Sequence, residues 1–297
     1  MANSKNERIF QLIINVFLMI MVILVIIPIW LLIAGSITDD ASLVSNGYSL
    51  IPKVFSLSAY EYLLFKSKDI FHALGISFLI TAIGTAVSLM ITPLLAYPLS
   101  RKDFVARNFI SFFVFFTMLF NGGIVPSYIM WTQLFHIKNT LWALIIPNLL
   151  MNGFSVIMMK NYFAQNIPLE LIEASKIDGA GELYIFRKVV LPLSLPIMAT
   201  IGLLVGIGFW NDWTNGLYYV NDSRYFSLQN LLNRILTNVQ FLASSTEISQ
   251  GGGANMKLPA VSIRMAIAVV GVVPIMALYP FFQKYFVKGI TIGAVKG

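Results

Sequence analysis

Residues 16–35 read VFLMIMVILVIIPIWLLIAG, a run of twenty residues without a single charged side chain. A helix of about 17 to 25 apolar residues is long enough to cross the ~30 Å hydrocarbon core of a bilayer. Inside that core only a helix or a closed barrel satisfies the polar groups of the backbone. This stretch therefore predicts a membrane-spanning helix.

Five further stretches also lack charged residues, although the chain has 20 basic and 13 acidic side chains. With 58% hydrophobic residues and a mean hydropathy of +0.79, the chain is too apolar for a soluble domain. A membrane barrel would instead show short alternating segments. The sequence predicts an all-α integral membrane protein of one domain, residues 1–297, with six transmembrane helices. The expected spans are approximately 9–36, 72–99, 108–131, 141–160, 189–212 and 264–283.

The distribution of lysine and arginine predicts the orientation, because basic residues gather on the cytoplasmic side. Six spans place both termini on one side. If that side is the cytoplasm, the inner segments hold twelve of the 20 basic residues. We therefore expect cytoplasmic termini, a cytoplasmic loop at 161–188 and an external loop at 213–263. The net charge of +7 then reflects a membrane surface rather than nucleic acid.

Several classes of catalytic site are unsupported by the sequence. The chain has no cysteine and only two histidines, so we expect no metal site and no catalytic residue. The phosphate-binding pattern G-x-x-x-x-G-K-[ST] does not occur. We therefore do not expect this chain to hydrolyse ATP itself.

The cytoplasmic loop has the most legible local pattern. Residues 161–196 read NYFAQNIPLELIEASKIDGAGELYIFRKVVLPLSLP. Pro168 favours a first helical turn, and a short helix is expected over Leu169–Ile177. Gly179 and Gly181 should end it, and a second helix should follow over Glu182–Val190. Two short helices around a glycine turn form a compact knob that needs a groove on another protein.

The external loop contains one amphipathic segment and one glycine run. Apolar residues recur at helical spacing over Ser227–Ala243, which predicts a helix. Beyond it, glycines interrupt regular structure. This tip suits contact with an external protein, and a simple spacer is the alternative. The candidate contact residues are Gly251, Gly252, Gly253 and Asn255.

The cytoplasmic loop resembles a known family motif. Glu173-Ala174-Ser175, three residues, Gly179, nine residues and then Val189-Val190-Leu191-Pro192 is similar to the EAA loop of the inner-membrane subunits of binding-protein-dependent ABC importers. Serine replaces the second alanine and valine replaces isoleucine at 189. Residues 120–129, 209–222 and 283–297 resemble the carbohydrate-uptake branch, especially maltose-permease-G-like subunits that serve oligosaccharides from complex glycans.

The resemblance implies a type I ABC importer permease in a bacterial cytoplasmic membrane. Its partners would be a second permease, a dimer of ATPase subunits that binds ATP and magnesium, an external solute-binding protein, a sugar and the lipid bilayer. The chain itself would bind no cofactor. Glu173 would pair with a basic group of the ATPase. The other residues implied in ATPase coupling are Ala174, Ser175, Asp178, Gly179, Leu191 and Pro192, and those of a tail at the ATPase interface are Lys288, Gly289, Gly293, Lys296 and Gly297.

Polar and aromatic residues within the expected spans are candidates for the substrate pathway. Sugars need hydrogen-bonding groups and aromatic faces, and polar side chains in a membrane seldom face lipid. The alternative is that the asparagines join helices and the tryptophans mark the interface. The candidates are Asn121, Asn148, Asn152, Trp210, Asn211 and Asp212.

Two other functions are alternatives to an importer subunit. A stand-alone secondary carrier or channel for a small polar solute usually has ionisable residues at the midplane, which the charge-free stretches lack. A membrane enzyme acting on lipid-linked sugars would need paired carboxylates or metal ligands near the membrane. The sequence therefore favours the permease of an ATP-driven sugar importer.

Overall fold

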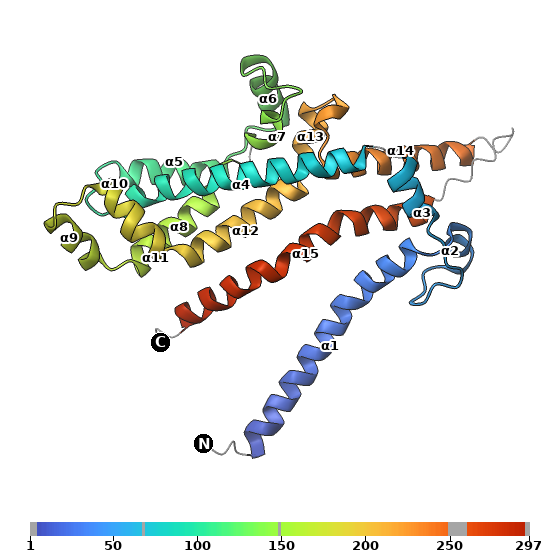
Figure 1. Cartoon of the computed structure of the whole chain (residues 1–297), viewed down its shortest axis with the longest axis horizontal. Coiled ribbons are helices and arrows are strands. Elements are labelled where there is room, and N and C mark those ends of the chain that lie inside the picture. Colours follow the sequence, from blue (N-terminus) through green and yellow to red (C-terminus); the bar gives the residue numbers. More distant parts are fainter. Residues whose placement is uncertain (1–4, 67–68, 148–149, 249–259, 295–297) are drawn as a thin grey trace. The chain divides into compact units, whose positions relative to one another are not determined.

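A computed structural model describes residues 5–66, 69–147, 150–248 and 260–294 of the chain (Figure 1). In these residues the structure is helical, and the one β-type pairing is an isolated bridge between Thr38 and Phe55. The expectation of an all-α chain is therefore confirmed for the described part. The chain divides into two compact units, Met1–Ile70 with Leu232–Pro274 and Phe71–Leu231 with Ile275–Gly297.

The first unit begins with α1, Lys5–Ser36. From residue 9 to residue 30 every side chain of α1 is exposed, although nearly all are apolar. A helix that is apolar on all sides requires lipid or other helices around it. The remaining elements of this unit are α2 (Asp40–Asn46), α3 (Ser58–Glu61), the π-helix η1 (Tyr62–Lys66), most of α14 (Leu228–Ile248) and the first part of α15 (Ala260–Ala294).

A carboxylate holds the start of α15 within the first unit. Asp40 Oδ1 accepts hydrogen bonds from the backbone N–H groups of Val261 (2.8 Å) and Ser262 (2.9 Å) and from the Ser262 hydroxyl (3.3 Å). The first N–H groups of a helix have no partner within the helix, and a carboxylate there also interacts favourably with the helix dipole. Asp40 thus caps a helix that lies more than 200 residues further along the chain.

Four long helices of the second unit lie side by side (Figure 1). They are α4 (Ile70–Ser100), α5 (Arg107–Leu119), α8 (Gly153–Asn166) and α12 (Leu195–Asn211). α8 contacts both α5 and α12. The buried core between them includes Ile80, Met159, Ile201 and Phe209. Gly84 of α4 lies directly against the ring of Phe209, which brings α4 close to α12.

Short elements gather at one end of these four helices (Figure 1). They are α6 (Ile124–Ile129), the π-helix η2 (Met130–Leu134), α7 (Trp142–Ile145), α13 (Thr214–Tyr219) and the 3-10 helix η4 (Ser223–Tyr225). The amphipathic helix expected over Ser227–Ala243 is present as α14. Its first N–H group, that of Leu228, donates to the Ser77 hydroxyl of α4 at 2.8 Å.

The elements of the segment expected as the cytoplasmic loop lie at the opposite end of the four helices (Figure 1). They are α9 (Leu169–Ile177), α10 (Glu182–Ile185), the π-helix η3 (Phe186–Val190) and α11 (Leu191–Leu193). The two short helices predicted for the loop are thus confirmed, since α10 and η3 together cover Glu182–Val190.

The helices do not reproduce six uninterrupted spans. Among the described residues, two are long and apolar enough to cross a membrane alone, Ile9–Ser36 and Ile70–Ser100. Arg107–Leu119 with Ile124–Leu134, and Glu182–Leu193 with Leu195–Asn211, form pairs that bend by 112° and 79°. The first bend follows from Gly123, whose φ of +86° is left-handed.

The stretch expected as a span at 141–160 also differs. α7 ends at Ile145, and α8 begins at Gly153 and continues to Asn166, beyond the expected start of the loop at 161. Pro147 lies between the two helices and lacks the N–H that would continue a helical hydrogen-bond ladder. Apolar composition revealed where the chain is compatible with a membrane but not where its helices break.

Candidate functional site

The turn after α9 depends on one glycine. Gly179 has a φ of +83°, its N–H donates to the carbonyl of Lys176 (3.0 Å), and the N–H of Ala180 donates to that of Ser175 (2.9 Å). These two bonds close a helix end around a left-handed residue. Gly181 has a φ of −73° and directly precedes α10, so α9 ends at the left-handed Gly179, and the expectation that Gly181 also ends this helix is wrong.

The start of α9 also differs slightly from the expectation. Pro168 has φ −60° and ψ 131° and stands immediately before the helix rather than in its first turn. Its extended ψ directs the chain away from α8 before α9 begins. The proline therefore sets the entry into the helix, and its missing N–H leaves no donor unpaired there.

α9 presents a largely uncovered surface. Ile172 is its one buried residue among those described, whereas the apolar side chains of Leu169 and Ile177 are 52% and 87% exposed. The candidate coupling residues Glu173, Ala174 and Asp178 are exposed as well. Ser175 is half-buried and its hydroxyl donates to the Leu171 carbonyl at 2.7 Å. An exposed helix with both apolar and acidic side chains is suited to docking on another protein.

The second half of the loop, α10 with η3, is anchored in the core formed with the long helices. Ile185, Phe186 and Val190 are buried in the same core as the long helices. Leu191 is half-buried and Pro192 is exposed in α11, where the chain turns toward α12. The loop therefore has an exposed first half, α9, and a fixed second half, α10 with η3.

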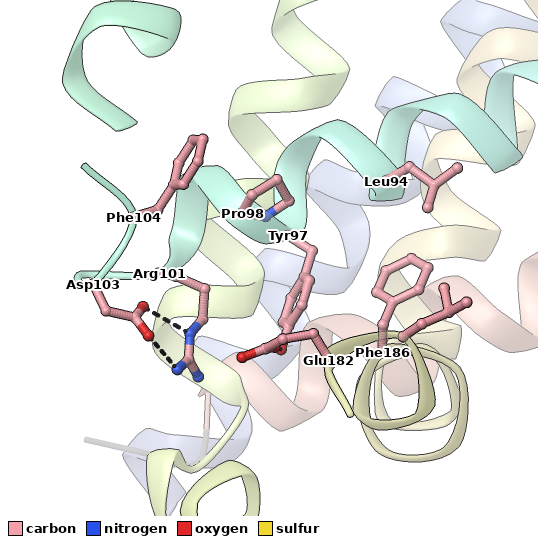
Figure 2. Close-up of a pocket in the computed structure, with 9 residues that line it drawn as sticks. Leu94, Tyr97, Pro98, Arg101, Asp103, Phe104, Glu182 and Phe186 are labelled. Atoms are coloured by element: carbon pink, nitrogen blue, oxygen red, sulfur yellow. Dashed lines mark hydrogen bonds and ion pairs between the residues drawn. The ribbon is translucent and has the colours of Figure 1, made fainter. Parts of the chain in front are cut away.

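Polar side chains connect these two halves to the end of α4, and Figure 2 shows four of them, Tyr97, Arg101, Asp103 and Glu182. Lys176 Nζ lies 2.6 Å from Glu182 Oε1, and the Tyr97 hydroxyl donates to Glu182 Oε2 at 3.0 Å. Lys176 Nζ also lies 3.7 Å from Asp103 Oδ2. Asp103 in turn accepts two bonds from the Arg101 guanidinium, at 3.1 and 3.0 Å. We call these five residues the loop–α4 network.

The charged side chains of the loop–α4 network stabilise one another's ionised forms. The hydrogen bond from Lys176 is the main reason why the pKa of Glu182 lies below its usual value. The hydrogen bond from Arg101 likewise lowers the pKa of Asp103 and raises that of Arg101 itself. Both carboxylates are therefore ionised at neutral pH.

A cavity of about 420 Å³ lies beside this network (Figure 2). Its walls are mainly apolar, and Arg101, Asp103 and Glu182 supply its charged groups. The remaining lining residues are Leu94, Tyr97, Pro98, Phe104, Leu183 and Phe186. The cavity thus adjoins the junction between α4 and the loop, away from the exposed surface of α9.

The candidate pathway residues do not form one cluster. Asn152 and Asp212 accept hydrogen bonds from backbone N–H groups at the starts of α8 and α13. Asn121 accepts a bond from the N–H of Gly123 at 2.9 Å within the bend after α5. The hydrogen bonds of these three side chains are structural. Asn211 is exposed, and Asn148 lies outside the described residues.

Trp210 differs from the other pathway candidates. It is buried, and its ring packs edge-on against Phe78 with centroids 5.1 Å apart. It also lines a second cavity, of about 370 Å³, together with Gly202 and Gly206 of α12 and Thr85 of α4. This cavity is lined by residues of α4 and α12, and the two glycines belong to α12.

The remaining candidates fall mostly at the edge of the described chain. Lys288, Gly289 and Gly293 belong to the helical backbone of α15, whereas Lys296 and Gly297 lie outside the described residues. Gly251, Gly252, Gly253 and Asn255 also lie outside them. In the ranges that the structure does describe, no group of three or more histidine or acidic side chains could hold a metal ion.

Sequence reasoning missed the loop–α4 network. Tyr97 and Glu182 are 85 positions apart, and Glu182 occupies one of the nine unspecified positions of the loop motif between Gly179 and Val189. A tyrosine at the inner end of an apolar stretch, followed by Arg101 and Asp103, is the one signal that was available. It indicates a membrane boundary but does not identify a distant partner.

Comparisons with known proteins match nearly the whole chain. Residues 89–292 match the family described as "Binding-protein-dependent transport system inner membrane component". The chain is 40% identical over 292 residues to the polygalacturonan/rhamnogalacturonan transport system permease protein YtcP of Bacillus subtilis, covering 98% of this chain and 100% of that one. It is 39% identical over 297 residues to protein LplC of Bacillus subtilis, covering 100% and 98%.

A solved structure agrees with these sequence matches. It is the crystal structure of a bacterial ABC transporter involved in the import of the acidic polysaccharide alginate. The similarity has a TM-score of 0.77 with 28% sequence identity, and it covers 96% of this chain and 99% of that chain. The sequence matches give the family, and the structural similarity separately gives the fold.

Proposed function

This chain belongs to the family of inner membrane components of binding-protein-dependent transport systems, and from that premise we propose how it works within an importer. It is a permease subunit of an ABC importer of sugars or oligosaccharides and not an enzyme. The observation that carries the proposed mechanism is α9, an exposed helix fixed by the left-handed Gly179 turn.

In the proposed mechanism α9 docks on the ATPase subunit. Its exposed apolar side chains would enter a groove, and the exposed Glu173 carboxylate would pair with a basic group there. Ala174 and Gly179 add little bulk and allow close approach. ATP and magnesium would be bound by the ATPase dimer, so that closure of the dimer displaces α9. The end of α15, with Lys288, Gly289 and Gly293, would reach the interface between the ATPase subunits.

We also propose the membrane topology in detail. The six spans expected from the sequence, with both termini in the cytoplasm, agree with the excess of lysine and arginine on that side. The bacterial cytoplasmic membrane is the proposed location. The bent pair Arg107–Leu119 with Ile124–Leu134 would count as one broken span, which membrane proteins tolerate where the broken backbone is buried in protein or lines a water-filled cavity. In the second bent pair α12 would cross the membrane, and most of Glu182–Leu193 would stay in the cytoplasmic loop.

The proposed assembly contains a second permease, an ATPase dimer and an external solute-binding protein. A single chain exposes α1 from residue 9 to residue 30 and leaves much of α5 uncovered, which is compatible with a partner subunit as well as with lipid. The external contact with the binding protein would include the segment Gly251 to Asn255. Trp210 and the neighbouring cavity would lie along the sugar pathway.

The proposed substrates are oligosaccharides released from acidic polysaccharides. One relative is named for polygalacturonan and rhamnogalacturonan, and the similar structure belongs to an importer of alginate. The charge-free stretches of this chain offer no cation to a uronate carboxylate. We therefore expect this subunit to contact hydroxyl groups and sugar rings, and the partner subunits to hold the acid groups.

The test is ATP-dependent uptake in a reconstituted system. The chain is assembled in liposomes with its second permease, its ATPase and its binding protein, and labelled oligogalacturonate is supplied outside with ATP inside. Uptake that needs all four components and ATP supports the proposal. Uptake by the chain alone without ATP would instead support a secondary carrier. Competition by unlabelled neutral oligosaccharides would show whether the acid groups are required.

A further inference from the structure

Tyr97 and Glu182 join parts of the chain that the family motif does not connect. The loop motif accounts for α9, for the Gly179 turn and for the residues that lead into α12. It assigns no role to the end of α4. We propose that Glu182 is a positioning residue that locks the coupling loop to the cytoplasmic end of α4, so that the two move as one body. This inference rests on the proposed function.

The first step of the argument is that both carboxylate oxygens of Glu182 are engaged from opposite sides. Oε1 receives Lys176, in the last turn of α9, and Oε2 receives the hydroxyl of Tyr97 on α4. Glu182 itself stands in the first turn of α10. One side chain thus connects three helices across the Gly179 turn.

The second step concerns which contact is firm. Lys176 and Glu182 are 39% and 55% exposed, and ion pairs between exposed side chains contribute little by themselves. Tyr97 is only 9% exposed, and its ring packs against Phe186 of η3 and Phe163 of α8, with centroids 5.3 and 6.4 Å apart. Because Tyr97 is fixed by this packing, its hydroxyl provides an immobile donor to a charged acceptor. Tyr97 is therefore the anchor, and Glu182 transmits its position to Lys176.

The third step concerns what would move without this lock. α9 buries Ile172 and otherwise has few contacts of its own, whereas η3 is buried against the long helices. The backbone bonds of the Gly179 turn run from the turn to the last residues of α9 and not to α4. Side-chain bonds from Lys176 to Glu182 and Asp103 hold α9 to the end of α4 more directly. A displacement of α9 by the ATPase would then reach α4 without being absorbed at the turn.

The decisive measurement is the number of sugar molecules imported per ATP hydrolysed by the complete transporter in liposomes. Tyr97→Phe removes the hydroxyl and keeps the ring, and Glu182→Ala removes both bonds. Each should lower this ratio by about threefold or more, with ATPase subunits still bound at the wild-type stoichiometry. The double variant should import no fewer sugar molecules per ATP than the single variant with the lower ratio. The reason is that both substitutions remove the bond between Tyr97 and Glu182.

Tyr162→Phe is the matched control. It also removes a phenol hydroxyl, one that donates to the Leu193 carbonyl of α11 at 3.3 Å. Its ratio should equal that of the wild type. An unchanged ratio in both Tyr97→Phe and Glu182→Ala would overturn the inference. A loss of uptake and ATP hydrolysis in equal proportion would also overturn it, because that indicates less folded complex rather than poorer transmission.

A second measurement follows the movement itself. The chain contains no cysteine, so spin labels can be placed at Val105→Cys, beside the end of α4, and Glu170→Cys, on α9. The distance between the labels should be the same without nucleotide and with ATP trapped. In Tyr97→Phe it should shift or broaden on ATP binding. A distance that already changes in the wild type would refute movement as one body.

The two proposals fail in different ways. If the wild-type assembly imports no sugar with ATP, the proposed function fails. If the wild type imports sugar and the Tyr97 and Glu182 variants keep its ratio, only the positioning role fails.

Discussion

The ring of Phe209 in α12 fills the space that a Cβ atom on Gly84 of α4 would occupy. A Cβ built on Gly84 would lie 2.6 Å from both Cε1 and Cε2 of that ring, closer than real Cβ contacts. Phe209 is fully buried, so the ring has little room to move away. This contact fixes how closely the two long helices approach.

Gly84→Ala should therefore destabilise the protein by about 1 to 3 kcal/mol, the usual cost of adding bulk to a packed core. Gly75→Ala is the control in the same helix, since nothing lies within 4 Å of its would-be Cβ. Replacing a helical glycine by alanine in open space adds up to about 1 kcal/mol of stability. Unfolding in detergent, followed by circular dichroism, compares the two. Equal stability for both variants would contradict the close packing of Gly84.

Gly179→Ala should weaken transport through the backbone alone. The position is left-handed and has open space around it, so an added methyl group meets no neighbour. The left-handed backbone costs an L-residue roughly 1–2 kcal/mol, which would release the turn that orients α9. ATP-dependent sugar uptake should fall, while membrane insertion stays normal.

Two further variants separate the explanations for Gly179. Gly181→Ala, at an ordinary φ of −73°, should transport like the wild type. Gly179→Asn tolerates the left-handed conformation and should recover most of the uptake. If asparagine fails while the protein keeps its normal stability, close approach to the ATPase rather than backbone geometry is the role of Gly179.

Glu173→Ala should reduce sugar uptake at least tenfold and separate ATP hydrolysis from transport. The carboxylate is exposed, so its removal should not affect folding, and its expected partner is a basic group on the ATPase. Co-purification of the ATPase and uptake in liposomes are the measurements. Glu170→Ala, a second exposed glutamate in the first turn of α9, is the matched control. Equal effects of both substitutions would point to general charge loss instead of a specific pair.

The segment from α9 to α11 was the most predictable part of the chain, for a physical reason. Its helices are short, and local signals define their ends: Pro168 before α9, Gly179 after it and Pro192 near the start of the next segment. Such signals act over a few residues and are therefore visible in one sequence. The confirmed bounds of Leu169–Ile177 and Glu182–Val190 reflect this.

The membrane region was predictable only in outline. Hydropathy responds to composition, so it revealed the apolar stretches but not the break between α7 and α8 or the bend at Gly123. Gly123 and Pro147 permit these interruptions but do not dictate them, since Pro93 and Pro98 lie inside the unbroken helix α4. Contacts such as Tyr97 with Glu182, or Asp40 with the start of α15, join residues distant in the sequence and leave no local pattern.

Asp40→Ala should destabilise the start of α15 by about 1 kcal/mol or more, because it removes acceptors for two backbone N–H groups and one hydroxyl. Hydrogen exchange of the amides of Val261 and Ser262 should accelerate in this variant. Asp40→Asn keeps an oxygen acceptor and should accelerate exchange less. Unchanged exchange in the alanine variant would mean that water replaces the carboxylate without cost.

The loop–α4 network should lose its effect in acid. The pKa of Glu182 is lowered in the folded protein, chiefly by the hydrogen bond from Lys176, so the folded state favours the ionised carboxylate. Its contribution is then complete above the ordinary glutamate pKa of about 4.3 and is lost as the pH falls through the lower folded value. The thermal unfolding temperature of the wild type should exceed that of Glu182→Gln at pH 7. The difference should shrink once the pH falls below about 4, whereas Glu170→Gln should match the wild type throughout. If the difference in unfolding temperature between the wild type and Glu182→Gln stays constant from pH 7 to pH 3, the shape of the Glu182 side chain and not its charge holds the loop.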